Sequence, residues 1–321
     1  MYKYVLLNNL EVRHANAMVN QYMVCPAIPM TVRQFSHALA MAVDAKNEES
    51  GAAIVYHDVQ MLGQRGKYGF SPQQRRGAVL INNRDYPGGS KSLSMQPVAT
   101  MHLRVSVVIR FSDDAYLDSE DIERFLHSAR LGGGVLQPNT ERPHPFDIRL
   151  FDDISELSAA LKSGYLLIDR RDLLEGQDDI LKAFSESLTE FGFRRSILLV
   201  DEWADKKKGN RDLLGDEFEE IASPVREMES RRKDRIDSAP LSKMGGTIIP
   251  TTLGYIHLEG PLHDVPTRGG YPAVFSEPAI GFVEFVKVRE YMEQHSLPFW
   301  DYAYLGPDGQ DGVVVQCENL Q

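Results

Sequence analysis

The sequence predicts an α+β fold based on a split β-α-β unit, which is the ferredoxin-like arrangement of RNA-recognition domains. The main observation is the order of amphipathic segments in the first half of the chain: strand, helix, strand, long hairpin, strand, helix, glycine-rich loop, strand. Composition agrees with a packed core, because the 321 residues are 42% hydrophobic, 9% aromatic and 25% charged. We therefore expect a folded globular chain.

Hydrophobic periods define the first strand and helix. Residues 4–13 alternate as a half-buried strand does, with one face made of Tyr4, Leu6, Leu10 and Val12. A capping box of Thr31 and Gln34 predicts the start of a helix. The apolar stripe of this helix consists of Val32, Phe35, Leu39, Ala42 and Val43. Its opposite face carries Arg33, Gln34 and His37.

The third predicted strand has the clearest pattern, because every odd position from Ala99 to Phe111 is apolar. A shorter strand at residues 51–59 precedes it, and an amphipathic helix at residues 119–130 follows. The helix ends before three consecutive glycines, Gly132 to Gly134. Without Cβ atoms, their backbone N–H groups can approach a phosphate closely.

Composition divides the chain into three parts. Residues 1–200 are expected to form an RNA-recognition-like core, from which a basic hairpin, the thumb, extends at about residues 60–97. Residues 201–243 form a charged helical insertion, and residues 244–321 complete the core. Later elements are expected as strands at residues 165–168, 196–200, 247–257 and 271–276, and as a helix at residues 281–294.

Charge is distributed unevenly along an acidic chain of net charge -11. From Val55 to Arg110 there are eight Lys or Arg residues against two Asp residues, a local balance of +6. Such a window is expected where one face of a protein meets a polyanion, although a solvated basic face would read the same way. The window is also rich in glycine, proline and asparagine, which favours a long exposed hairpin.

Several function classes have little support. No apolar run approaches the roughly 18 residues of a membrane span, so no membrane partner is expected. Cys25 and Cys317 are far apart, which indicates a reducing, cytoplasmic location without structural zinc or disulfides. The common catalytic motifs for phosphate, dinucleotide, zinc and serine-hydrolase chemistry are absent. We therefore expect no enzyme and no cofactor or metal.

Four segments resemble a known family, the Csy2-type (Cas five, RAMP) subunit of the type I-F CRISPR surveillance complex. They are residues 9–17 (NLEVRHANA), residues 26–39 with PAIP and VRQFSHAL, residues 130–136 (RLGGGVL), and residues 246–255 with GTIIP and GY. The resemblance implies a non-catalytic Cascade subunit that caps the 5′ handle of the CRISPR RNA (crRNA). It also implies as partners an adjacent Cas seven-type backbone subunit, a large subunit where present, and target double-stranded DNA.

The family match and the basic window together give the candidate RNA-binding residues. They are Asn16, Arg33, Gln34, His37, Arg65, Lys67, Arg75, Arg76, Arg84, Arg104, Arg130, Gly132, Gly133 and Gly134. The insertion does not align with the family pattern and resembles instead the added helical part of the variant type I-F member. That resemblance implies contacts with the DNA next to the protospacer, from Lys206, Lys207, Lys208, Arg231, Arg232 and Lys233.

Two alternatives remain open from the sequence. One is a metal-independent crRNA-processing ribonuclease on the same fold, with a base such as His14, His37 or His102 on the polar side of an element. The other is a protein-protein interaction module in which the basic window docks an acidic partner. Steep salt dependence of RNA binding would argue against the second, because counterion release marks phosphate contacts.

Overall fold

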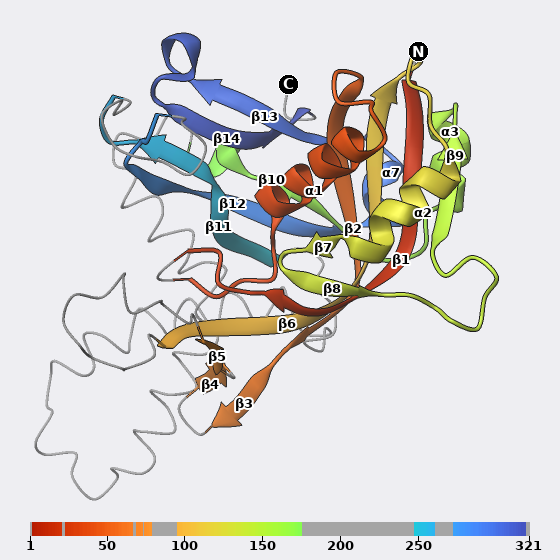
Figure 1. Ribbon diagram of the computed structural model, residues 1–321. Helices are drawn as coiled ribbons and strands as arrows, with labels where there is room; N and C mark the ends of the chain where they lie inside the picture. The colour runs from red at the N-terminus through yellow and green to blue at the C-terminus, as the bar shows by residue number, and fades with distance from the viewer. Residues whose placement is uncertain are drawn as a thin grey trace, which may run out of the picture.

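The structure is a computed structural model that describes residues 2–20, 23–66, 69–72, 74–78, 95–174, 247–260 and 272–318. The fold is mixed α+β, with one large antiparallel sheet and few helices (Figure 1). The predicted α+β class is confirmed. In the described part of the chain, no helix combines the length and hydrophobicity needed to cross a membrane.

The first half of the chain supplies most of the central strands. Its elements are β1 (Tyr2–Asn16), α1 (Pro29–Ala42), β2 (Glu49–Met61), β3 (Gly63–Gly66), β4 (Gly69–Pro72), β5 (Gln74–Ala78), β6 (Met95–Ser112), α2 (Ser119–Ser128), β7 (Arg130–Leu131), β8 (Gly134–Gln137), β9 (Asp147–Phe151), α3 (Ile154–Ala160), β10 (Tyr165–Asp169) and the 3-10 turn η1 (Arg171–Leu173). The second half contributes β11 (Thr247–His257), β12 (Ser276–Lys287), α7 (Val288–Met292), β13 (Trp300–Leu305), the 3-10 turn η3 (Pro307–Gly309) and β14 (Gly312–Cys317).

The large sheet has the strand order β10-β12-β11-β14-β13-β2-β6-β1-β8-β7, and β9 pairs with β1 beside β8. β1 and β6 are its long central pair. β3 pairs with β4, and β5 pairs with the first residues of β6, so the described part of the segment between β2 and β6 consists mainly of short strands where the thumb was expected.

β6 behaves as the sequence predicts. Every odd residue from Ala99 to Phe111 is buried in one core, which also contains residues of α1 and α2. In Figure 1 these two helices lie on the near face of the sheet. A second, smaller core on the other face contains residues of α3 and α7. The sheet is therefore covered on both sides near its centre.

β1 departs from the predicted alternation, because it contains two bulges. Tyr4 and Leu6 belong to the smaller core, whereas Leu10 and Val12 belong to the larger one. Register shifts between Leu7 and Leu10 and between Val12 and Ala15 each insert one residue and change which face the next side chains occupy. The prediction that Tyr4, Leu6, Leu10 and Val12 share one face was therefore wrong.

α1 begins earlier than expected. Its N-cap is Ile28 and Pro29 is its first residue, so the capping box of Thr31 and Gln34 does not form. α2 begins where predicted and ends two residues earlier, at Ser128, because Arg130 belongs to β7. The carboxylate of Asp118 caps α2 by accepting from the backbone N–H of Glu120 at 3.0 Å.

The C-terminal elements differ more from the prediction than the N-terminal ones do. Residues 281–287 were expected to be helical, but they belong to strand β12, and only the five residues of α7 follow as a helix. The expected strand at residues 271–276 overlaps β12 only at its last residue. The expected strand at residues 196–200 and the whole insertion lie outside the described residues.

Candidate functional site

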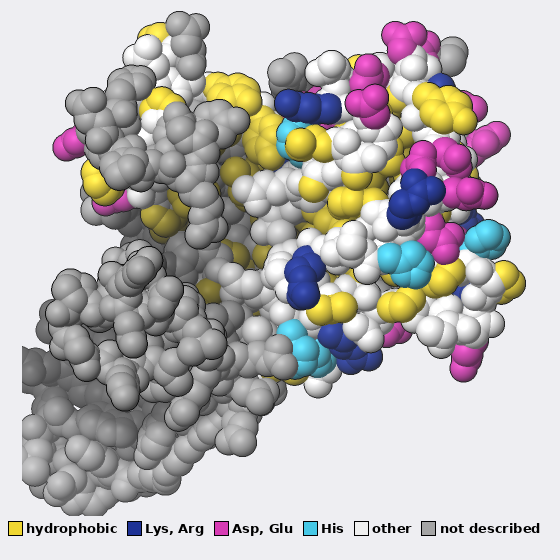
Figure 2. All heavy atoms as spheres, viewed as in Figure 1, with side chains coloured by type: hydrophobic (Ala, Val, Ile, Leu, Met, Phe, Trp, Pro, Cys, Tyr) yellow, Lys and Arg dark blue, Asp and Glu magenta, His cyan; other side chains and the backbone are white. Residues whose placement is uncertain are grey.

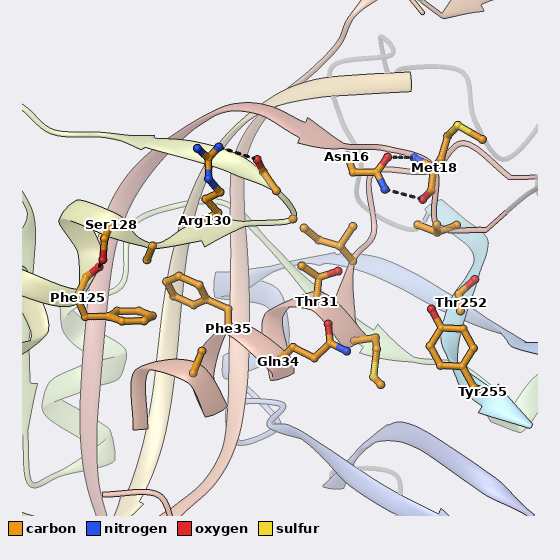
Figure 3. A pocket seen from close by; sticks show the side chains of 17 residues that line it. Asn16, Met18, Thr31, Gln34, Phe35, Phe125, Ser128, Arg130, Thr252 and Tyr255 are labelled. Carbon is orange, nitrogen blue, oxygen red and sulfur yellow. Dashed lines mark hydrogen bonds between the residues drawn. The ribbon is translucent and has the colours of Figure 1, made fainter. Parts of the chain in front are cut away.

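A pocket of about 760 Å³ opens on the face that carries α1 and α2 (Figure 3). It lies between the first half of α1, the end of α2, the β7–β8 hairpin, the segment after β1, and β11. Its walls are formed by Asn16, Met18, Val19, Ile28, Met30, Thr31, Gln34, Phe35, Ala38, Phe125, Ser128, Ala129, Arg130, Gly132, Gly133, Thr252 and Tyr255. This volume is within the range of sites that hold a small ligand.

The glycine-rich segment forms a two-residue hairpin turn on the rim. Gly132 and Gly133 have φ angles of 59° and 73°, and Leu131 pairs with Gly134 across the turn. Positive φ at both central residues is what a type I′ turn requires, and glycine adopts it without steric cost.

Gly134 has a different role from its two neighbours. It is buried, and a Cβ atom there would lie 2.7 Å from Val12 Cγ1 and 2.7 Å from the backbone nitrogen of Ala15. Glycine therefore lets β8 pack directly against β1. Gly134 does not line the pocket, so its prediction as an RNA contact is not supported by its position.

Arg130 contributes the positive charge at the rim. Its side chain is exposed and lies over the turn, where Nη1 is 3.4 Å from the carbonyl oxygen of Gly133 (Figure 3). A hydrogen bond of this length leaves most of the five guanidinium N–H donors directed to solvent. Figure 2 shows acidic side chains gathered over the start of α2 on this face, away from the mainly apolar and uncharged centre.

Asn16 holds the pocket wall next to the turn. Its backbone N–H donates to the carbonyl oxygen of Gly132 at 2.8 Å, and its side-chain amide bonds both the N–H and the carbonyl of Met18 at 2.9 and 3.0 Å (Figure 3). Both polar atoms of the side chain are therefore engaged in shaping the loop. Asn16 lies in the predicted site, as a positioning residue.

The first turn of α1 forms the third polar wall. Met30, Thr31 and Gln34 line the pocket, and this turn contains no acidic residue. The first backbone N–H groups of a helix have no partner within the helix and concentrate positive potential there. Gln34 is exposed, and its side-chain amide is available at the mouth.

The floor of the pocket is apolar and aromatic. Phe35 from α1 and Phe125 from α2 lie with ring centroids 5.6 Å apart and an interplanar angle of 53°. Ile28, Ala38 and Ala129 extend this surface. The pocket thus combines hydrogen-bond donors and positive charge at the rim with a surface suited to a planar apolar group.

Four separate segments of the chain contribute residues to these walls. They are residues 9–17, 26–39, 130–136 and 246–255, the same segments that resemble the Csy2-type family. The sequence matches the family model for the CRISPR-associated protein Cas_Csy2 over residues 5–309. The chain belongs to this family. No curated protein matches the sequence.

Membership of the Cas_Csy2 family makes the chain a CRISPR-associated subunit of Cascade. Five of the candidate residues meet at its pocket, namely Asn16, Gln34, Arg130, Gly132 and Gly133. His37 is half-buried on α1 and does not line the pocket. Arg104 is exposed on an even position of β6, on the side of the sheet opposite to the pocket.

Arg33 occupies the interior of this family member. Its side chain is 5% exposed, with Nη1 2.6 Å from Oε2 of Glu49 and Nε 2.9 Å from Oδ1 of Asp301. The guanidinium also lies over the ring of Tyr302, 4.3 Å from its centroid. The prediction that Arg33 lies on an exposed polar face was wrong, because this side chain is buried and pairs with the buried Glu49 and the partly exposed Asp301. Its contact with RNA stays a prediction.

The thumb residues are described only in part. Arg65 belongs to β3, and Arg75 and Arg76 belong to β5, which pairs with residues 95–99 of β6. The base of the thumb adjoins the pocket wall, since Ala17 N–H donates to the carbonyl of Ala99 at 2.9 Å. The remaining candidates lie outside the described residues, namely Lys67, Arg84, Lys206, Lys207, Lys208, Arg231, Arg232 and Lys233.

Sequence reasoning missed the aromatic residues of the site. The helical pattern of residues 119–130 does not single out Phe125 as a site residue, and Tyr255 appears only as part of the GY motif. The sequence does contain one signal for Tyr255, namely the glycine before it. In the structure, a Cβ atom at Gly254 would lie 2.1 Å from the carbonyl oxygen of Val313, so only glycine fits there. A glycine that permits such close strand approach fixes the position of its neighbour.

Proposed function

We propose that this Cas_Csy2 family member is a non-catalytic, RNA-binding subunit of a type I-F Cascade that holds the 5′ handle of the crRNA in the pocket. The observation that supports this most directly is the two-part chemistry of the pocket. Arg130, the Gly132–Gly133 turn and the start of α1 form a rim for an anion, and Phe35 and Phe125 form an aromatic floor.

The rim suits a phosphate group. Arg130 supplies a permanent positive charge, and the glycine turn lets backbone N–H groups approach without interference from side chains. At Gly133 a Cβ atom would meet nothing within 4 Å, so the apex of the turn is open to a ligand. Charge-assisted hydrogen bonds of this kind are stronger than bonds between neutral groups.

The floor suits a base that has left a stack. Sequence-specific proteins bind single-stranded RNA by accepting splayed bases on aromatic side chains and bonding their edges. Phe125 offers such a surface, and Gln34 offers an amide that can both donate to and accept from a base edge. A double helix presents no splayed base, so the proposed ligand is single-stranded.

The topology supports a ferredoxin-like, RNA-recognition-like core of the RAMP kind. Around the central pair β1 and β6, the neighbours are β2 on one side and β8 with β9 on the other. α1 follows the first strand, α2 follows the third, and both contribute to the same core. This order supports the split β-α-β arrangement that the sequence predicts.

Partners of the subunit are proposed on the same basis. We propose that the thumb, which follows β2 and precedes β6, contacts the adjacent Cas seven-type backbone subunit while the pocket holds the handle. A role of the insertion in binding target DNA beside the protospacer, and an association with a large subunit, stay predictions. They depend on residues outside the described part of the chain.

The test is a comparison of two arginine variants in the assembled complex. The chain is co-expressed with its genomic neighbours and a repeat-spacer RNA, and protection of the 5′ end of the RNA is measured. Arg130→Ala is expected to weaken RNA binding about tenfold and to lower the salt slope by about one. Arg124→Ala is the matched control, because Arg124 is exposed on α2 and paired with Asp121.

Three outcomes contradict the proposal. Equal RNA affinity for both variants removes the pocket as the site. A complex that assembles without RNA removes RNA binding as the function. Cleavage of the repeat RNA by the chain in EDTA removes the non-catalytic assignment and favours a metal-independent ribonuclease.

A further inference from the structure

A row of residues crosses four strands beside the pocket. Tyr304 of β13 is paired with Val313 of β14, Val313 with Tyr255 of β11, and Tyr255 with Pro278 of β12. Directly paired residues of an antiparallel sheet share one face. Tyr255 also lines the pocket, so the row continues the pocket wall across the sheet.

The two tyrosines of the row are open to solvent. Tyr255 is 42% exposed and Tyr304 is 71% exposed, whereas Val313 and Pro278 between and beside them are half-buried. One strand separates the two tyrosines, so their backbones lie about 10 Å apart. That spacing leaves room for a planar group over each ring.

The ring of Tyr304 is held in place by the turn after β13. A Cβ atom at Gly309 would lie 3.1 Å from Cδ1 of Tyr304, so the ring packs directly against the glycine backbone. Gly309 has a φ of 75°, which favours glycine. One side of the ring is therefore supported while the residue stays largely exposed.

A stacked pair already exists on this face of β13. Tyr302, two residues before Tyr304 and on the same side of the strand, carries the Arg33 guanidinium 4.3 Å from its ring centroid. A flat, delocalised group thus fits over a tyrosine at this face. Tyr304 occupies the next equivalent position and is far more exposed.

The other side of the same sheet region differs in composition. Ile256 of β11 follows Tyr255 and so points to the opposite face. Just after β11, the exposed Leu258 donates a 2.9 Å backbone hydrogen bond to the carbonyl of the exposed Phe275. That opposite face exposes aliphatic groups typical of protein contacts. The pocket face presents tyrosines, which suit stacking of bases.

We propose that Tyr255 and Tyr304 form a base-stacking platform for the single-stranded RNA that continues from the pocket across β11, β14 and β13. This inference rests on the proposed function and adds a second contact region for the same RNA. Stacking on tyrosine accepts any base, because every base has a π-face. The platform therefore contributes affinity without selecting a sequence.

The experiment uses the assembled complex and four variants. Tyr304→Ala removes the ring, Tyr304→Phe keeps it, and Tyr304→Leu keeps apolar bulk without a ring. Tyr116→Ala is the matched control, because Tyr116 is 82% exposed and lies between β6 and α2, outside the row. RNA affinity is measured at several salt concentrations with the repeat-spacer RNA, and subunit content is measured by gel.

The expected result is a loss of about tenfold in RNA affinity for the Ala and Leu variants, with near-native affinity for the Phe and Tyr116 variants. The salt slope should stay unchanged for all four, because no phosphate contact is lost. Arg130→Ala, measured in parallel, should change the slope. This difference separates stacking from phosphate binding.

Two results overturn the platform while the proposed function stands. One is unchanged RNA affinity for Tyr304→Ala when Arg130→Ala is impaired. The other is loss of a protein subunit from the Tyr304→Ala complex with unchanged RNA affinity, which assigns the row to a protein interface. If no variant and no wild-type complex binds RNA, the proposed function itself fails.

Discussion

Nε1 of Trp300 donates a hydrogen bond of 3.0 Å to the backbone carbonyl of Leu167. This bond connects β13 and β10, which pair with neighbouring parts of the same edge of β2. Trp300, the first residue of β13, pairs with Ala52, and β10 pairs with β2 only a few residues later, at Val55 and Tyr56. The indole thus fills the gap between β13 and β10 and joins the two halves of the chain.

Replacing Trp300 should therefore destabilise the whole fold. Trp300→Phe keeps an aromatic ring but leaves the buried carbonyl of Leu167 without its donor, which costs about 1–3 kcal/mol. Trp300→Ala adds a large cavity in a fully buried position and should cost about 3–5 kcal/mol. Urea unfolding measures both. Tyr116→Phe at an exposed site is the control, and equal stability of Trp300→Phe and wild type would contradict this account.

The strands were predictable to the extent that their geometry is regular. β6 contains no extra residue in either of its long pairings, so its odd positions all face one core, as the sequence pattern indicates. β1 has bulges at Asn9 and His14, both with positive φ. There the backbone N–H groups donate to Ser106 Oγ and His102 Nδ1 of β6, at 2.9 and 3.1 Å. Such bonds depend on side chains about 90 residues away and leave no local signal.

The site was predictable in the same partial way. Gly132, Gly133 and Arg130 were predictable because turn-forming residues and charge can be recognised from the local sequence. Arg33 was misplaced because its partners, Glu49 and Asp301, are separated from it by 16 and 268 residues. Tyr255 could not be joined to α1 from sequence, because β11 reaches the pocket only through long-range strand pairing.

Arg33 variants should affect stability and leave the salt dependence of RNA binding unchanged. Arg33→Ala leaves Glu49, whose side chain is 1% exposed, without its cation, and should cost about 3–5 kcal/mol. The double variant Arg33→Met with Glu49→Leu removes both charges and should recover most of that loss. Chemical unfolding measures the stabilities. A double variant as unstable as Arg33→Ala would show that the pair itself is required.

The salt slope distinguishes this role from an RNA contact. Assembled complexes that carry the double variant should bind the repeat-spacer RNA with a wild-type slope, because the buried Arg33 neutralises no phosphate. A slope lowered by about one would instead place Arg33 on the RNA.

Substitutions of the hairpin glycines should destabilise the fold to different extents, in a defined order. Gly134→Ala places a Cβ atom 2.7 Å from a backbone nitrogen of β1 and should cost about 1–3 kcal/mol. Gly133→Ala meets no atom within 4 Å and should cost about 1 kcal/mol, from its φ of 73°. Gly133→Asn should cost less, because Asn adopts this region more readily. Thermal unfolding measures the order, and a Gly133→Ala loss larger than that of Gly134→Ala would contradict it.

His57 should make the fold less stable in acid. Its Nδ1 lies 2.9 Å from the carbonyl oxygen of Ser163, which can only accept, so Nδ1 carries a proton. Nε2 lies 2.7 Å from Oγ of Ser106. Burial lowers the pKa of His57 below its ordinary 6.5; the positive charges of Arg104 and Lys162 act in the same direction, and the bond to Ser163 opposes them.

The sign of the pH effect follows from proton binding. Between the lowered pKa and 6.5, the unfolded chain binds more protons at this residue than the folded chain does. The stabilisation is therefore complete above pH 6.5 and is lost as the pH falls through the folded-state pKa, with a slope of at most about 1.4 kcal/mol per pH unit. Urea unfolding at about pH 7.5, 6.5 and 5.5, one unit above, at and one unit below the ordinary pKa, measures this pH dependence of the unfolding free energy. His57→Gln, which cannot titrate, should flatten the dependence, and an unchanged acid loss in that variant would assign the effect to other groups.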